Sequence, residues 1–343
     1  MGKTKAPELT LWLHLYYTGR DITDKIGILA KPELNPVVET FKENILRALR
    51  LSIFPLATYM TGKRFQMAES EAYFKVTGNP FPNKFSHRVP KGVAELRDAM
   101  LDGVAESSLP MITLTPNEEE QVFALGDLGN SMVTDVLMPM QIVTAWSALE
   151  TLFGDLWVSA LNAHPHGLSD LKGTKPKAVK SKEKQKQEKP KDDETRTDQQ
   201  EADDDKDRDF HQKINMTMLQ LYDFNLKEKM GTLLRTNVNF TTLDGIKEAY
   251  WRAFFDHAGT IHNSLANDHL RYLCEVRNLI VHKSSVCDKE FRDKARRLPG
   301  YPRELEPGQR LEFNGQMVHN MLVQPVQCSV DLIKAVDSWI KTH

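Results

Sequence analysis

Three residues near the end of one helical stretch carry side chains suited to phosphate chemistry. Arg277, Asn278 and His282 stand in the run RNLIVHK, with the histidine five positions after the arginine. A guanidinium binds phosphate through a planar fork of donors, and an imidazole changes its charge near neutral pH. These residue types fit the cleavage of a phosphodiester, with Arg277 stabilising charge, Asn278 orienting its neighbours and His282 transferring protons.

The spacing of this motif is not specific by itself, because RAFFDH repeats it from Arg252 to His257. The surroundings distinguish the two copies. Helical periodicity puts Arg277 on a stripe of apolar residues, where a guanidinium is costly unless it is paired. That stripe consists of Leu270, Leu273 and Ile280, with Val281 beside it.

Glu150 is the best candidate for the partner of Arg277, because it flanks the apolar stripe of an earlier helix. A structural Arg277–Glu150 pair, with His282 as an ordinary helix-terminal cation, is the alternative to a catalytic role. Both interpretations meet a geometric difficulty, since residues five apart on an ideal helix point about 140° apart. Either the helix ends near Val281 and turns His282 back, or two chains place their motifs in one cleft.

The elements that must position these residues are mostly helical. Residues 133–164 are predicted to form a long amphipathic helix that starts near Pro139 and ends before Pro165. Helices are also expected at 210–236, at 241–263 with a break near Gly259, at 267–283 and at 321–341. Asn267 or Asp268 is expected to cap the helix of the motif, and Asn314-Gly315 predicts a small β-hairpin.

The rest of the chain divides by composition. Residues 1–130 are predicted to be a mostly helical region of unknown role, with one strand at 9–17. Residues 166–209 hold many lysines and then many acids with almost no apolar residues, which indicates a disordered insertion. That insertion interrupts a second region, 131–343, which is predicted to be a helical bundle.

Composition limits the classes of function. The 343 residues carry a net charge of −2, so the chain has no overall basic field for coating nucleic acid. Its three cysteines lie at no metal-ligand spacing, so we expect neither a metal nor a cofactor. The first residues do not fit a signal peptide and no apolar run reaches about 18 residues, so a cytoplasmic protein without a membrane span is expected.

The block EVRNLIVHK, together with the basic loop, the G-x-x-L-x-F run and the closing helix after it, resembles the C-terminal half of HEPN domains. These are four-helix bundles found in many RNA-targeting defence and toxin proteins. Their motif is an Arg followed after four to six residues by His, with a polar residue directly after the Arg. Arg277, Asn278 and His282 match it. The segment AWSALETLFGDLW is similar to the first helix of the family, where an acidic residue such as Glu150 is common.

The resemblance covers about residues 133–343 and implies an all-α, HEPN-like four-helix bundle with a small hairpin. It further implies a metal-independent endoribonuclease of a defence or toxin system, leaving 2′,3′-cyclic phosphate and 5′-hydroxyl ends. Such enzymes pair into homodimers with a shared cleft, and an antitoxin or regulatory partner often accompanies them. Two alternatives stay open: a non-catalytic helical module that binds RNA, a nucleotide or a protein, and a structural protein of a larger complex.

Overall fold

The fold was obtained as a computed structural model, which describes residues 11–81, 90, 92–101, 133–173, 216–226, 228–255 and 258–343. Every named element within these ranges is helical, which confirms the expected all-α class. The N-terminal helices are α2 (Leu15–Asp24), α3 (Asn35–Leu49), α4 (Phe54–Thr77) and α5 (Val93–Leu101), with single 3₁₀ turns at Pro32–Leu34 and Arg50–Ser52. The next group is α8 (Met138–Ala163) after a π turn at Val133–Leu137, then α9 (Pro165–Leu168), α10 (Met216–Leu221) and α11 (Met230–Leu234). A 3₁₀ turn at Arg235–Asn237 leads to α12 (Leu243–Ala253), α13 (Gly259–Leu265), α14 (Asp268–Lys283), α15 (Lys289–Ala295) and α16 (Gly315–Thr342).

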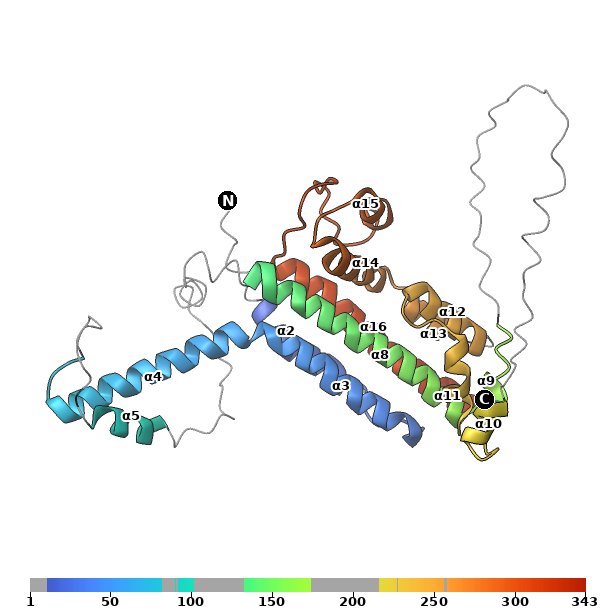
Figure 1. Cartoon of the computed structure of the whole chain (residues 1–343), viewed down its shortest axis with the longest axis horizontal. Coiled ribbons are helices and arrows are strands. Elements are labelled where there is room, and N and C mark those ends of the chain that lie inside the picture. The colour runs from blue at the N-terminus through green and yellow to red at the C-terminus, as the bar shows by residue number, and fades with distance from the viewer. Residues whose placement is uncertain are drawn as a thin grey trace, which may run out of the picture.

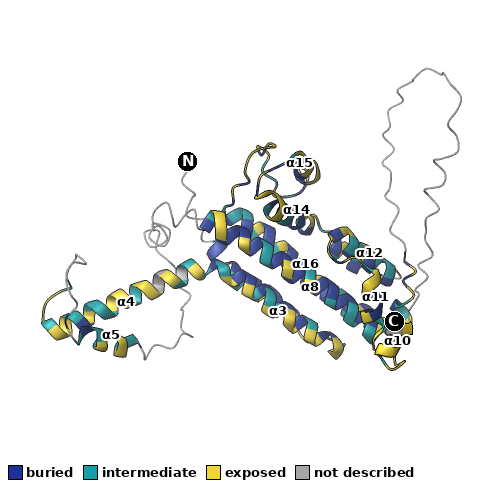
Figure 2. Ribbon diagram, viewed as in Figure 1, coloured by how far each residue is buried: buried dark blue, intermediate teal, exposed yellow. Residues whose placement is uncertain are grey.

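Two long helices, α8 and α16, lie side by side at the centre of the molecule. In Figure 1, α2 and α3 cover one side of this pair, and α12, α13 and α14 cover the other. Both central helices are largely buried, as the dark blue of Figure 2 shows. The stripe predicted for the first bundle helix is confirmed, because all seven of its residues are at most 1% exposed: Ile142, Trp146, Leu149, Phe153, Leu156, Trp157 and Ala160.

Helix α8 begins and ends where its prolines predict. Pro139 stands in its first turn, where the missing N–H costs no hydrogen bond, and the helix ends at Ala163, just before Pro165. Residues Val133–Ala163 are long and apolar enough for a membrane span by composition alone, but 61% of the most apolar window is buried inside the structure. A buried core helix passes the same test of length and composition, so this segment is only weak evidence for a membrane span. A cytoplasmic location stays a prediction.

The helices of residues 11–49 share the core of the central pair. Gln141 of α8 is fully buried, and its Oε1 accepts a 2.7 Å hydrogen bond from the indole Nε1 of Trp12. The carboxylate of Asp337 on α16 accepts bonds of 2.9 Å and 2.8 Å from the backbone N–H groups of Ala30 and Lys31. These contacts join α2 and α3 to the bundle, and the sequence did not predict them. By contrast, α4 extends away from the bundle with α5 packed against it (Figure 1).

The strand predicted at 9–17 is wrong for its described part. Residues 11–13 are helical and α2 begins at Leu15. The buried positions Trp12, Leu15, Gly19 and Ile22 are spaced by three or four residues, which is the period of a helix rather than the alternation of a strand.

The hairpin predicted at Asn314-Gly315 is also wrong. Asn314 is the N-cap of α16, its Oδ1 accepting a 2.8 Å bond from Met317 N, and Gly315 is the first helical residue. The chain before α16 is held by an isolated antiparallel bridge between Val286 and Arg310. The Asn-Gly pair therefore begins a helix instead of forming a turn. As a result, α16 begins six residues before the expected 321.

Two predicted segment limits change as well. The segment expected as one helix at 210–236 contains α10 and α11, separated by a turn in which Asp223 and Phe224 have positive φ. Leu168 and Leu171 are buried, so the start of the predicted insertion at 166 is packed against the bundle. The remainder of that insertion, 174–209, lies outside the described residues.

Candidate functional site

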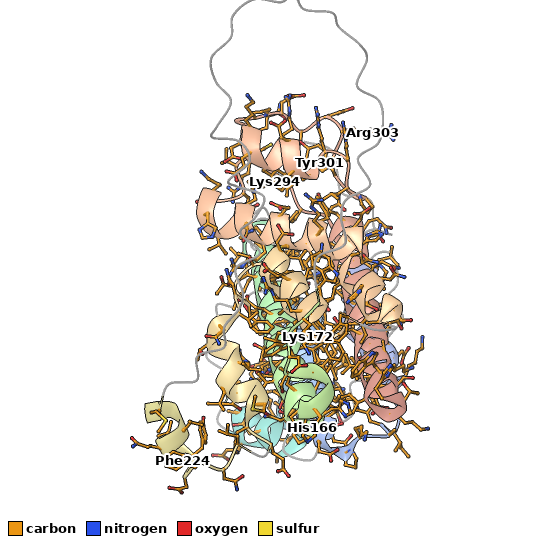
Figure 3. All side chains as sticks on the ribbon, turned by 90° about the vertical axis from the view of Figure 1, so that its right-hand side faces the viewer. His166, Lys172, Phe224, Lys294, Tyr301 and Arg303 are labelled. Atoms are coloured by element: carbon orange, nitrogen blue, oxygen red, sulfur yellow. The ribbon has the colours of Figure 1, made fainter. Side chains whose placement is uncertain are left out.

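The motif residues line one pocket beside α14. Arg277, Asn278 and His282 all border a hollow of about 650 Å³, whose other walls come from the start of α12 and from α15. Trp146 of α8 also borders it. Figure 3 shows that Lys294 of α15, another lining residue, lies near Tyr301 at one end of the molecule, far from His166 and Phe224 at the other.

Helix α14 has its N-cap at one of the two predicted residues. The side chain of Asn267 caps it, accepting bonds from His269 N at 2.8 Å and Leu270 N at 3.3 Å. Leu270 and Leu273 are buried against the core, whereas Val281, expected beside their stripe, is 48% exposed. The apolar stripe therefore ends before the last turn, and the motif lies where the helix leaves the core.

Asn278 forms a hydrogen bond with the arginine of the motif. Nη1 of Arg277 donates a 3.1 Å hydrogen bond to Oδ1 of Asn278. On an ideal helix Asn278 points about 100° from Arg277 but only about 40° from His282. The arginine side chain therefore reaches along the helix surface to the amide, and both Arg277 and His282 border the pocket.

The helix does not end early, as one solution to the geometric difficulty required. It runs through Lys283 and stops at Ser284, whose φ of 51° is left-handed. His282 is therefore an exposed residue of the last turn. Side-chain reach, rather than a change in the backbone, lets Arg277 and His282 border the same pocket.

The predicted Arg277–Glu150 pair is not formed. Among the residues that the structure describes, no ion pair involves either side chain, and the one hydrogen bond to the Arg277 guanidinium is that with Asn278. Nε of Arg277 is buried without a hydrogen-bond partner. A guanidinium bound to a neutral amide keeps its full charge toward the pocket, which a paired one would not.

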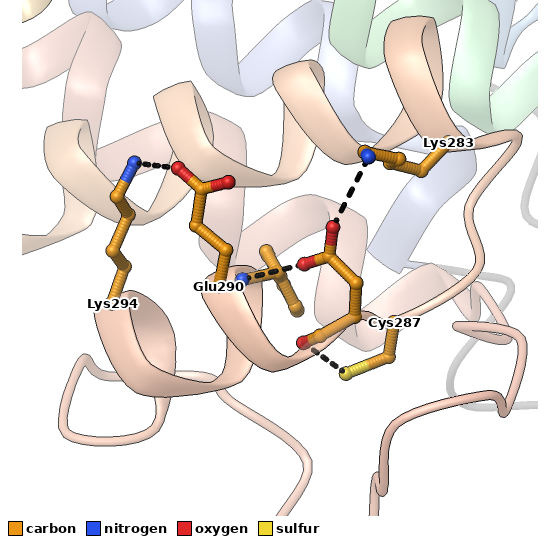
Figure 4. A network of polar contacts seen from close by, with 6 residues as sticks. Lys283, Cys287, Glu290 and Lys294 are labelled. Atoms are coloured by element: carbon orange, nitrogen blue, oxygen red, sulfur yellow. Dashed lines mark hydrogen bonds and ion pairs between the residues drawn. The ribbon is translucent and has the colours of Figure 1, made fainter.

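Two of the other cations in the pocket are neutralised by neighbours. Lys294 Nζ lies 2.8 Å from Glu290 Oε1, and Lys283 Nζ lies 3.4 Å from Asp288 Oδ2 (Figure 4). Asp288 also caps α15 by accepting a 2.8 Å bond from Phe291 N, and this N–H together with Lys283 lowers the pKa of its carboxyl. These contacts hold α15 against the end of α14 and close one side of the pocket.

Burial changes the acidity of three further lining groups. It lowers the pKa of Lys247, with Arg271 adding to the effect and Asp244 opposing it. It raises the pKa of the Glu275 carboxyl, against the influence of Lys294 and Arg271. Burial also raises the pKa of the Cys274 thiol to about 12, so this side chain lines the pocket as an uncharged thiol.

Two lining residues, Lys247 and Arg271, were not predicted from the sequence as site residues. Arg271 stands six positions before Arg277 in the same helix, so its helical spacing to Glu275, Asn278 and His282 was available as a signal. Lys247 had no such signal, because it comes from α12 and only the packing of α12 on α14 brings it to the pocket.

The second copy of the spacing forms no comparable site. Arg252 binds Glu248 one turn earlier, with Nη2 2.6 Å from Oε1, and His257 lies outside the described residues. Within the described parts of the chain, no group of three or more His, Cys, Asp or Glu side chains is arranged to hold a metal ion.

Comparison with known proteins yields no relative. No family model, no curated protein and no solved structure matches this chain.

Proposed function

We propose that this protein is a metal-independent endoribonuclease of the HEPN type, with Arg277, Asn278 and His282 as its active-site residues. The observation that carries the proposal is that all three line one pocket and that the arginine is bound to a neutral amide rather than to a carboxylate. A guanidinium that forms no ion pair can stabilise charge on a phosphorane, and an exposed imidazole can transfer a proton.

The proposed reaction uses the 2′-hydroxyl of RNA as the nucleophile. One group takes the proton of that hydroxyl while O2′ attacks phosphorus, and another gives a proton to O5′ as the P–O5′ bond breaks. The products are a 2′,3′-cyclic phosphate and a 5′-hydroxyl. His282 would perform one of these transfers, Arg277 would stabilise the charge on the phosphorane, and Asn278 would hold the guanidinium in place.

A homodimer would supply the second proton-transfer group. His282 is exposed at the end of α14, and the neighbouring Val281 is also 48% exposed, which is compatible with a second chain against this end of the helix. Two copies of the motif would then share one cleft. We further propose that the enzyme acts in a defence or toxin system and is restrained by a regulatory partner. Glu150 would take no part in the chemistry.

The alternative is a non-catalytic module of the same fold that binds RNA, a nucleotide or a protein. One observation favours it: four carboxylates line the pocket beside its cations, which reduces its net positive charge. They belong to Asp244, Glu275, Asp288 and Glu290.

End mapping of cleaved RNA distinguishes these functions. Wild-type protein and His282→Ala are incubated with transfer RNA and with a mixed-sequence RNA in EDTA. Cleavage by wild type alone, leaving cyclic phosphate ends, is the expected result. The matched control is His319→Ala, which removes a half-buried histidine of α16 outside this pocket and should cleave like wild type. Equal cleavage by the wild type and His282→Ala would overturn the assignment of the site, and no cleavage by any of them would favour the binding module.

A further inference from the structure

The cations of the pocket fall into two groups. Lys283 and Lys294 are engaged with the carboxylates of Asp288 and Glu290, as described above. The other three, by contrast, form no ion pair with any residue that the structure describes. They are Lys247, Arg271 and Arg277, which together we call the cationic cluster.

Lys247 approaches the motif from a different helix. It lies in the second turn of α12, whereas Arg271 and Arg277 belong to α14, so the cationic cluster spans the two walls of the pocket. The start of α12 faces the same hollow, since Thr242 and Leu243 line it. The N-terminal end of a helix carries partial positive charge, which adds to that of Lys247.

Lys247 is half-buried, and no carboxylate of the described residues lies at ion-pair distance from it, which is a costly state for an ammonium group. Burial lowers the pKa of Lys247, with a further contribution from Arg271. An anion placed between α12 and α14 would offset this cost and raise that pKa again. The nearby carboxylates, Asp244 and Glu275, oppose binding, although burial raises the pKa of the Glu275 carboxyl.

We propose that the cationic cluster binds a phosphate of a single-stranded RNA substrate, with Lys247 and Arg271 holding the backbone that Arg277 and His282 act on. This inference rests on the proposed function for the identity of the substrate. Lys247 and Arg271 are binding and positioning residues. They set where the strand lies across the pocket, from α12 to the end of α14, and they transfer no proton.

The test measures binding without cleavage. A fluorescein-labelled RNA oligonucleotide with 2′-O-methyl groups lacks the nucleophile, so it reports on the phosphate contacts alone. Its affinity is measured by fluorescence anisotropy at several salt concentrations for wild type, Lys247→Met and Lys247→Arg. Each phosphate contact contributes about 0.7 to the slope of log affinity against log salt for a single strand.

We expect Lys247→Met to bind about five- to tenfold more weakly and to lower that slope by roughly 0.7, while Lys247→Arg keeps the slope. The matched control is the double variant Lys294→Met with Glu290→Gln, which removes a paired cation together with its partner. It should bind like wild type. Melting temperatures of all variants verify that each is folded.

An unchanged slope in Lys247→Met, or the same loss in the double control, would overturn the proposal. The two proposals also fail separately. Weaker binding by folded Lys247→Met in a protein that cleaves no RNA supports the cationic cluster and rejects the ribonuclease. Cleavage by Lys247→Met with the KM and salt dependence of wild type supports the ribonuclease and rejects a role for Lys247.

Discussion

The guanidinium of Arg277 donates its Nη1 hydrogen to the amide oxygen of Asn278, 3.1 Å away, although the two residues are neighbours in the sequence. Adjacent residues of an ideal helix point about 100° apart, so this bond turns the arginine around the helix toward the pocket. The arginine and the histidine, five positions apart, both line one hollow without a break in α14.

The first prediction concerns this bond. Asn278→Ala removes the acceptor and frees the guanidinium to move. A hydrogen bond to a charged group contributes about 1.5–3 kcal/mol, so we expect cleavage efficiency to fall roughly ten- to a hundredfold. Because Asn278 is only partly buried, the free energy of unfolding should change little. The measurements are kcat/KM on RNA and urea denaturation.

Asn278→Asp is the matched variant for the same position. It keeps the acceptor but adds a negative charge that pairs with Arg277, so binding of the 2′-O-methyl RNA should be weaker than for Asn278→Ala. Equal behaviour of Asn278→Ala and wild type would show that the amide does not position the arginine.

The second prediction separates a functional arginine from a structural one. Arg277 has no carboxylate partner among the described residues, and its Nε is buried without a bond. Arg277→Met should therefore abolish cleavage yet leave the free energy of unfolding unchanged or raised by up to about 1 kcal/mol. Glu150→Gln should alter it by less than about 0.5 kcal/mol.

Urea denaturation of both variants provides the measurement. A loss of about 3–5 kcal/mol in Arg277→Met, matched by a similar loss in Glu150→Gln, is the behaviour of a buried ion pair. That result would restore the structural Arg277–Glu150 pair and remove the argument for a free guanidinium.

The third prediction follows from the burial of Glu275. Burial raises its pKa in the folded protein, so the folded state binds the carboxyl proton more tightly than the unfolded state does. The resulting stabilisation is fully present below the ordinary carboxyl pKa and is lost as pH rises through the raised value. Glu275→Gln should thus be more stable than wild type near neutral pH. Since the side chain is partly exposed, the gain should stay below about 1 kcal/mol.

Urea denaturation at about pH 8 and at about pH 4 measures this effect, and the gain should shrink at the lower pH. Glu290→Gln is the control, because it removes a carboxylate paired with Lys294 and should give no gain at either pH. An advantage of Glu275→Gln that is the same at both pH values would mean that the carboxyl titrates normally.

The sequence predicted the long helices because their patterns repeat over several turns. The stripe of α8 from Ile142 to Ala160 and the cap of α14 at Asn267 are examples. It failed where the pattern was short. A few alternating residues around Trp12 fit a strand as well as a helix, and Asn314-Gly315 fits a turn as well as a helix start.

The site was predictable only along one helix. Arg277, Asn278 and His282 were found because they share α14, but the direction of the arginine depends on a side-chain bond that spacing does not encode. Lys247 was missed because its place in the pocket depends on how α12 packs against α14. Glu150 was wrongly paired because a helical pattern says which face a residue occupies but not which side chain it meets.

The last prediction tests how the N-terminal helices are attached to the bundle. Gln141 of α8 accepts a 2.7 Å bond from Trp12 Nε1 and donates from Nε2 to the carbonyl oxygens of Leu49 at 3.2 Å and Ala48 at 3.4 Å. These carbonyls end α3, where that of Ala48 also accepts from the N–H of Arg50 and that of Leu49 accepts a 2.9 Å bond from the hydroxyl of Ser52. Gln141→Leu leaves the buried indole N–H of Trp12 unpaired, so it should lower the free energy of unfolding by about 1–3 kcal/mol in urea denaturation. In Trp12→Phe the indole donor is already absent, so adding Gln141→Leu should cost less there than in wild type, and strictly additive losses would mean that the two side chains are not coupled.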